Sequence, residues 1–236
     1  MTSYPLGQDH TQDDQIAGSK RINEFIHYCF EYVCEEDQRK FRKKFREQPH
    51  DSDQIMHTFR ELILGAYLSA YDLQVRHDHP AGKQTPDWCI VSDESAVTGI
   101  VELTNFHIDR LTENQIRKQR EARGLAAYRR DENADNVGRM YHCIDRKAQA
   151  YRSLVRSLEV PYVVAVFGEF EALVDFDEVR LCLFDEKTGL FDMYPEMSGV
   201  LYFEEGSGRY LFSYEHNPNA LQVITLPSGI FPPSAA

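Results

Sequence analysis

The stretch that decides the fold is Thr85-Pro-Asp-Trp-Cys-Ile-Val-Ser-Asp93, followed after a turn by Thr98-Gly-Ile-Val-Glu-Leu-Thr-Asn105. Side chains alternate along an extended chain, so Glu102 and Thr104 share one face of the second strand. Asp87 opens the neighbouring strand. A carboxylate inside an apolar strand is costly unless a basic group or a hard cation with oxygen ligands neutralises it. The two strands therefore predict acidic groups that need a positive partner.

Helices are predicted before these strands. Apolar residues recur at helical spacing over about 19–45, with a break near Cys34, and again over about 51–67, where Glu61 lies in the middle. The extended segments that follow are typical of an antiparallel meander with Gly, Pro and Ser turns. These three predicted strands cover about residues 73–77, 86–92 and 98–106.

The second half of the chain continues the alternation of helix and strand. Residues 109–130 are polar and basic with weak periodicity, whereas Val137 to Leu158 has a clear helical period. An apolar run from Pro161 to Phe167 follows, which is typical of a central strand parallel to the strand before the helix. A short helix is predicted over 175–184, and a closing hairpin over 199–204 and 209–214.

This order predicts a mixed α/β (α+β) fold with a mixed central β-sheet flanked by helices. Residues 1–18 have no period and contain Pro5, Gly7 and Gly18, so we expect a flexible arm there. A single domain is predicted over 19–226, because no linker or internal repeat divides it. The remaining residues, 227–236, are predicted to form a tail of irregular coil without helix or strand.

Composition indicates a globular protein without a membrane span. The 236 residues are 42% hydrophobic and 27% charged, and no apolar run approaches the roughly 20 residues that a span needs. The first residues lack the basic and apolar regions of a secretory signal, so we expect a cytoplasmic protein. Five scattered cysteines without a C-x-x-C pair predict reduced, mostly buried thiols, and Trp88 is predicted to lie in the core.

Charge is uneven along the chain. The formal net charge is −12, yet the segment from Arg110 to Arg156 holds 12 Lys or Arg against 6 Asp or Glu. A second basic run extends from Arg39 to Arg46. Such runs are either solvated helix faces or phosphate-facing surfaces, and the sequence leaves both interpretations open.

Histidines raise a second metal hypothesis. His77 and His79 would place both rings on one face of an extended strand, and His107 also lies near the predicted strands. No zinc-finger spacing accompanies them. Nothing resembles a phosphate-binding glycine loop, a serine nucleophile elbow or a kinase signature, which argues against ATP-driven and covalent-hydrolase chemistry.

Taken together, Glu61 in a helix, Pro86-Asp87 at a strand entry and Glu102-Leu-Thr104 in the next strand resemble the PD-(D/E)xK nuclease superfamily. The resemblance covers about residues 51–167 and includes the order of the following helix and apolar strand. It implies a restriction-endonuclease-like core and a nuclease that hydrolyses phosphodiester bonds, with DNA favoured over RNA. It also suggests a bacterial or phage setting in defence, restriction or repair.

By this resemblance, Asp87, Glu102 and the carbonyl of Leu103 would bind Mg²⁺, with Mn²⁺ able to substitute. Glu61 would hold a metal-bound water or a second ion. The family usually has a lysine where this chain has Thr104, and threonine cannot carry a positive charge. Some members supply the amine from the next helix, where Lys147 is the candidate, and Arg146 is expected to point elsewhere. Gln149 and Tyr151 are possible helpers of Lys147, and Tyr151 shares the helix face of Lys147 whereas Gln149 does not.

Each of these residues also has a structural interpretation. Asp87 is then a strand-entry residue bonded to backbone donors, Glu61 a solvated helix residue and Lys147 a surface lysine. Two other functions therefore stay open: a catalytically inactive nuclease-like domain that binds nucleic acid or a protein partner, and a structural or inhibitory protein with an acidic surface. Cutting of a duplex would favour a homodimer.

Overall fold

The computed structural model describes residues 12–47, 52–107, 110–123, 136–169, 172 and 174–233. The chain divides into two compact units, an N-terminal unit over Met1–Gly99 and a C-terminal unit over Ile100–Ala236. A single domain over 19–226 stays a prediction.

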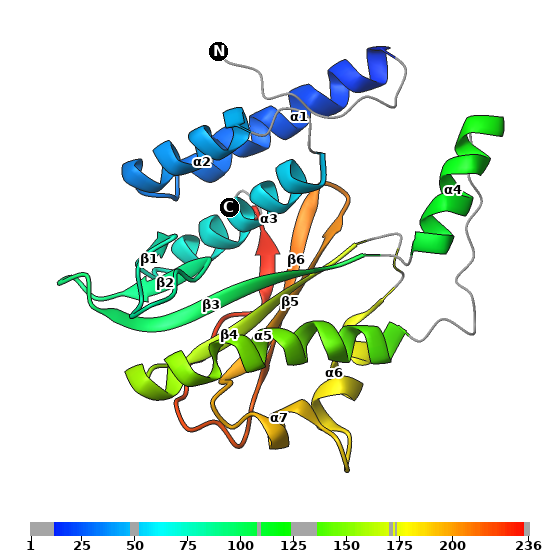
Figure 1. Cartoon of the computed structure of the whole chain (residues 1–236). Coiled ribbons are helices and arrows are strands. Elements are labelled where there is room, and N and C mark those ends of the chain that lie inside the picture. The colour runs from blue at the N-terminus through cyan, green and yellow to red at the C-terminus, as the bar shows by residue number, and fades with distance from the viewer. Residues whose placement is uncertain are drawn as a thin grey trace. The chain divides into compact units, whose positions relative to one another are not determined.

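Three helices and two strands make up most of the N-terminal unit. Helices α1 and α2 both contact α3, which in turn contacts β1 (Figure 1). The predicted break near Cys34 is confirmed, since it separates α1 from α2. Residues 1–11 of the predicted arm lie outside the described residues, but 12–18 are helical, so the helix begins earlier than Ser19. The elements are α1 (Gln12–Phe30), α2 (Glu35–Glu47), α3 (Ser52–Ala70), β1 (Val75–His77) and β2 (Trp88–Val91).

Trp88 lies at the centre of the N-terminal core, as the sequence predicts. Its ring is fully buried and stacks on Phe41 of α2, with 5.9 Å between the ring centroids. Its Nε1 donates a hydrogen bond to the backbone carbonyl of Glu61 on α3, at 2.9 Å. Gly65 of α3 faces the same indole so closely that a Cβ there would lie 1.9 Å from a ring atom. The core thus fixes the turn of α3 that carries Glu61.

The strands form a seven-stranded mixed sheet in the order β1-β2-β3-β4-β5-β6-β7. The pairs β3–β4 and β4–β5 are parallel, whereas β1–β2, β5–β6 and β6–β7 are antiparallel. Helix α3 contacts β1 in one unit and α5 contacts β4 in the other, so the predicted mixed α/β class is confirmed. The remaining elements are β3 (Val97–Phe106), α4 (Arg110–Arg123), α5 (Asn136–Leu158), β4 (Tyr162–Gly168), α6 (Phe176–Phe184), α7 (Leu190–Met193), β5 (Gly199–Gly206), β6 (Arg209–His216) and β7 (Gly229–Phe231).

In the C-terminal unit, β4 and α5 form the core that the sequence predicts. All seven residues of β4 are buried, and the strand runs parallel to β3 with Glu102 opposite Val164. Helix α5 contacts β4 and buries Met140, Ile144 and Ala148, which recur four residues apart and so lie on one face. This packing holds α5 beside the strand that carries Glu102.

The predicted hairpin is confirmed as β5–β6, but the predicted coil after Pro227 is wrong in part. Residues Gly229–Phe231 form β7, which pairs with β6, and Phe231 is buried. Residues 234–236 of the predicted tail lie outside the described residues. All five cysteines are free thiols, and three of them are buried. Among the described helices, none combines the length and the apolar character that a membrane crossing requires.

Candidate functional site

The C-terminal unit pairs a buried carboxylate with a lysine. Glu102 is 1% exposed on β3, where it is the single acidic residue of the strand. Lys147 of α5 donates from Nζ to Glu102 Oε2 at 2.7 Å. A charge buried this deeply is stable only with an opposite charge or good hydrogen bonds. Lys147 supplies both.

The position of Lys147 follows from the packing of α5. Ile144 and Ala148 face the core, and Lys147 lies at the border of that face with its side chain 26% exposed. The hydroxyl of Tyr162 on β4 donates to the carbonyl of Lys147 at 3.0 Å, and Tyr151 stacks on the Tyr162 ring. These contacts fix the backbone that carries the ammonium group. Gln149 instead donates from its side-chain amide to the two carboxylate oxygens of Asp145, on the exposed side of α5.

Thr104 and Leu103 follow Glu102 on the same strand. Thr104 is buried opposite Val166, and its hydroxyl carries no charge. Leu103 is buried opposite Ala165. Glu102 therefore meets a lysine from α5, the second helix after β3, rather than one at position 104.

In the N-terminal unit, Glu61 is the centre of a second buried cluster. Only 4% of this residue is exposed. Its Oε1 lies 3.1 Å from Nε2 of His57, and its Oε2 lies 3.1 Å from both His77 Nε2 and Lys44 Nζ. Asp78 completes the cluster, because its Oδ2 lies 3.0 Å from Lys44 Nζ. The structural interpretation of Glu61 as a solvated helix residue is therefore wrong.

The basic neighbours of Glu61 change its acidity. Burial by itself would raise the pKa of this carboxyl, because it disfavours the charged form. The hydrogen bonds from His57 and His77 and the charge of Lys44 act in the opposite direction and outweigh burial, so the pKa of Glu61 lies well below its ordinary value. Partial burial by itself would lower the pKa of Lys44, but the nearby carboxylates of Glu61 and Asp78 outweigh it and raise that pKa. Glu61 and Lys44 thus stabilise each other as an ion pair.

Asp87 lies in the N-terminal unit, in the bend just before β2. It is half-buried, and its backbone carbonyl accepts a hydrogen bond from the Asp78 amide at 3.2 Å. Of the predicted site residues, Asp87 and Glu61 therefore belong to the N-terminal unit. The C-terminal unit holds Glu102, Leu103, Thr104 and Lys147.

Lys44, His57 and Asp78 are site residues that the sequence did not single out. The spacing of His57 and Glu61, four apart on one helix, is a signal that the sequence does contain. Lys44 lies 17 residues before Glu61 on a different helix, so only the packed structure brings the two together.

The histidine-pair hypothesis does not match the backbone. Strand β1 ends at His77, and Asp78 has a φ of 47°, in the left-handed region, so the chain is not extended between His77 and His79. His107 contacts Glu169 through Nδ1 at 3.2 Å. Within the described ranges, no three or more His, Cys, Asp or Glu side chains are grouped to hold a metal ion.

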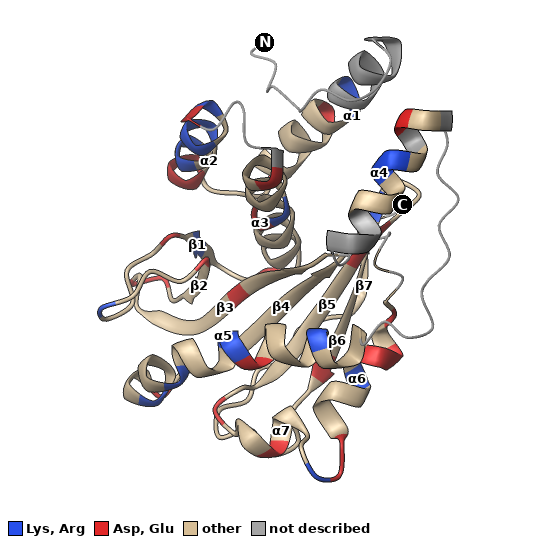
Figure 2. Ribbon diagram, turned by 45° about the vertical axis from the view of Figure 1, so that its right-hand side comes forward, with Lys and Arg blue, Asp and Glu red and all other residues tan. Residues whose placement is uncertain are grey.

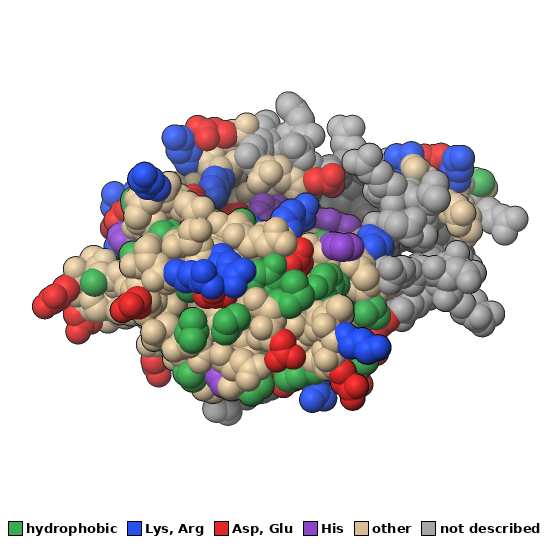
Figure 3. Space-filling view, turned by 60° about the horizontal axis from the view of Figure 1, so that its bottom comes forward, with side chains coloured by type: hydrophobic (Ala, Val, Ile, Leu, Met, Phe, Trp, Pro, Cys, Tyr) green, Lys and Arg blue, Asp and Glu red, His purple; other side chains and the backbone are tan. Residues whose placement is uncertain are grey.

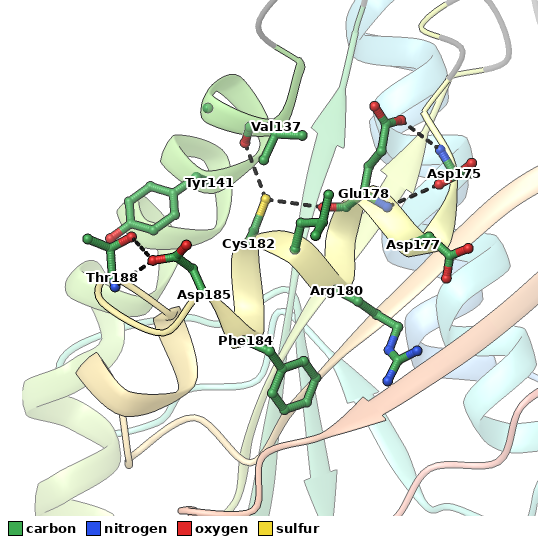
Figure 4. A pocket seen from close by; sticks show the side chains of 12 residues that line it. Val137, Tyr141, Asp175, Asp177, Glu178, Arg180, Cys182, Phe184, Asp185 and Thr188 are labelled. Atoms are coloured by element: carbon green, nitrogen blue, oxygen red, sulfur yellow. Dashed lines mark hydrogen bonds between the residues drawn. The ribbon is translucent and has the colours of Figure 1, made fainter.

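A groove of about 1150 Å³ lies beside α6 in the C-terminal unit. In Figure 4, Val137 and Tyr141 of α5 lie on one side of α6 and Arg180 and Phe184 on the other, while Cys182 is directed toward α5. Figure 3 shows one face of the molecule, where hydrophobic side chains gather among basic and acidic ones. Of the described residues, none that the sequence predicts for the site lines this groove.

Comparisons with family models, with curated proteins and with solved structures each gave no match.

Proposed function

We propose that the chain is a Mg²⁺-dependent nuclease that hydrolyses phosphodiester bonds, with DNA favoured over RNA. The observation that carries this proposal is the 2.7 Å ion pair between Lys147 and the buried Glu102. Because Thr104 stands where the family usually has a lysine, the sequence alone gives Glu102 no positively charged side chain on its own strand. An ammonium group from α5 beside Glu102 supplies that charge.

The donor atoms suit a hard divalent cation. Glu102 would hold it through a carboxylate oxygen and Leu103 through its backbone carbonyl, which are ligand types that Mg²⁺ and Mn²⁺ prefer. By the resemblance alone, Asp87 would add a second carboxylate. The buried ion pair of Glu102 supports this assignment, because it keeps a carboxylate in an ordered position on β3. When bound, the cation supplies Lewis-acid stabilisation of the charge that develops on phosphoryl oxygens.

The side chains of Lys147 and Glu61 have different proposed roles. Lys147 holds the Glu102 carboxylate in place and brings positive charge to the negative phosphoryl group, where fixed charges lower the barrier most. Glu61, held by Lys44, His57 and His77, is a fixed acceptor able to orient a water molecule. We assign Thr104 no proton-transfer role.

A second candidate function is an inactive nuclease-like domain that binds nucleic acid or a protein. It is favoured by the same ion pairs, because Glu102 and Glu61 are each already neutralised by a lysine, at 2.7 and 3.1 Å. A carboxylate paired in this way can be purely structural.

Cleavage assays separate the two candidates. Single- and double-stranded DNA and RNA are incubated with the protein in Mg²⁺, in Mn²⁺ or in a chelator. We expect cutting only with metal, and its loss in Asp87→Ala. The matched control is Asp93→Ala, which removes an exposed carboxylate from the same unit and should cut like the unmodified protein. No cutting by the unmodified protein would refute the nuclease, and equal metal-dependent cutting by both variants would refute a role of Asp87 in its site.

A further inference from the structure

Helix α2 presents a row of cations to solvent. Between Asp37 and Glu47 its sequence contains six Lys or Arg and no acidic residue. Four of them lie within an arc of about 100° around the helix axis, by the geometry of 3.6 residues per turn. All four are exposed, and they form what we call the basic stripe: Arg39, Arg42, Lys43 and Arg46. In Figure 2, α2 is blue along much of its length.

The two other cations of α2, Lys40 and Lys44, pair with acidic residues of the N-terminal unit. Lys40 contacts Asp37 at 2.9 Å, and Lys44 contacts Glu61 and Asp78. Both are half-buried and hold the N-terminal unit together. The buried face of the helix, with Phe41 and Phe45, lies opposite the basic stripe. Packing therefore explains one side of α2 but gives no reason for four cations on the other.

The contacts of the basic stripe are weak enough to be exchanged. Arg39 pairs with Glu35 at 2.9 Å and Lys43 with Glu47 at 3.7 Å, and both lysine and arginine side chains are 70% exposed. Exposed pairs of this kind contribute about 0–1 kcal/mol. The guanidinium of Arg42 lies over the Phe30 ring, 4.9 Å from its centroid, which limits its motion. The stripe is thus partly ordered, yet available to a stronger anion.

The charge pattern of the basic stripe is complementary to a polymer with regularly spaced anions. Arg39 to Arg46 spans about 10 Å along the helix axis, while each DNA strand places a phosphate about every 3.4 Å of duplex axis. A chain with a net charge of −12 would repel such a polymer unless a local cationic surface faced it. We propose that the basic stripe of α2 binds the phosphate backbone of duplex DNA. This rests on the proposed function only for the choice of polymer.

Salt dependence of binding tests the stripe without any cleavage. Binding of a fluorescently labelled duplex is measured by anisotropy in a chelator, across about 50 to 200 mM salt. Each phosphate contact contributes close to −0.9 to the slope of log affinity against log salt. Replacing Arg39, Lys43 and Arg46 by Gln should therefore reduce the slope by about 3 and weaken binding regardless of sequence.

The matched control removes the same charge from elsewhere. A triple variant with Gln at Lys20, Lys187 and Arg209 changes the net charge equally, and all three side chains are exposed. We expect its slope to stay close to that of the unmodified protein. Circular dichroism spectra of both triple variants should match that of the unmodified protein.

Three results would overturn the proposal that the basic stripe binds DNA. They are no DNA binding by the unmodified protein, equal slopes in the two triple variants, or stripe-dependent binding to anionic lipid vesicles without binding to DNA. Failure of the nuclease gives a different pattern, in which the stripe variant changes DNA binding but no metal-dependent cutting occurs.

Discussion

At the scale of single residues, Glu102 and Lys147 are the most informative pair. The sequence predicted a carboxylate on a strand face and an amine on the following helix. It could not give the 2.7 Å distance between them, because this distance depends on how α5 is placed against β4 by Met140, Ile144 and Ala148. Periodicity predicts a helix face, but not the register at which that face meets the sheet.

Replacing Lys147 tests the structural side of this pair. Lys147→Met keeps the apolar stem and leaves the Glu102 carboxylate buried without its ammonium partner. Removing one member of a buried pair costs about 3–5 kcal/mol, and the partial exposure of Lys147 reduces this to about 1–3 kcal/mol of unfolding free energy. Urea unfolding measures the loss. Adding Glu102→Gln to Lys147→Met should restore part of the stability, and additive losses would contradict a direct pair.

The cluster around Glu61 predicts a pH dependence. Because its pKa in the folded protein lies below the ordinary value of 4.5, ionised Glu61 stabilises the fold above about pH 4.5. This stabilisation is lost as the pH falls through the folded pKa. Glu61→Gln should therefore lower unfolding free energy by about 3 kcal/mol at neutral pH, and by progressively less in acid.

Denaturant unfolding across pH measures this difference. Glu24→Gln is the control, since Glu24 is an exposed glutamate of the same unit with a side chain 68% exposed. Its stability should follow that of the unmodified protein at every pH. A Glu61→Gln deficit that stays constant between neutral and acidic pH would contradict the assignment of the charge effect to Glu61.

At the scale of elements, long periodic segments were predictable and short ones were not. The helix over 137–158 and the apolar strand after it have strong patterns and appear as α5 and β4. Strand β7 has three residues and depends on pairing with β6, which no local pattern reveals. The start of α1 was missed because Gln12 to Gly18 is polar and ends in glycine, a pattern also typical of a loop.

Helix α3 gives an element-scale prediction. Gly65→Ala adds a methyl group that would lie 1.9 Å from the buried Trp88 ring. Overpacking of this kind costs about 1–3 kcal/mol, which exceeds the gain of about 1 kcal/mol in helix propensity. We expect a net loss of stability and a shift in Trp fluorescence, which reports on Trp88 alone because it is the single tryptophan.

Gly206→Ala serves as the control for this substitution, since no atom outside Gly206 and its two chain neighbours lies within 4 Å of a Cβ there. Its stability should stay close to that of the unmodified protein. A Gly65→Ala variant as stable as Gly206→Ala, with unchanged fluorescence, would mean that α3 and Trp88 pack less tightly than described.

At the scale of the whole molecule, the sequence predicted the fold class better than the chemistry. Alternation of helices and strands was sufficient for a mixed sheet with parallel strands around α5. The predicted site instead depends on side chains that are far apart in sequence. DNA as the substrate, cutting of a duplex and a homodimer remain proposals. Two equivalent sites on a two-fold axis would suit the two strands of a duplex.

The most direct test of the proposed nuclease compares two buried glutamates of the C-terminal unit. Glu196 is also buried, with 4% exposed against 1% for Glu102, and is paired with Arg152 and Arg156, but it plays no part in the proposed chemistry. The measurement is the rate of Mg²⁺-dependent DNA cleavage by Glu102→Gln and by Glu196→Gln, under conditions in which both variants are folded. We predict that Glu102→Gln loses cleavage while Glu196→Gln retains it; equal rates in the two variants would contradict a catalytic site at Glu102.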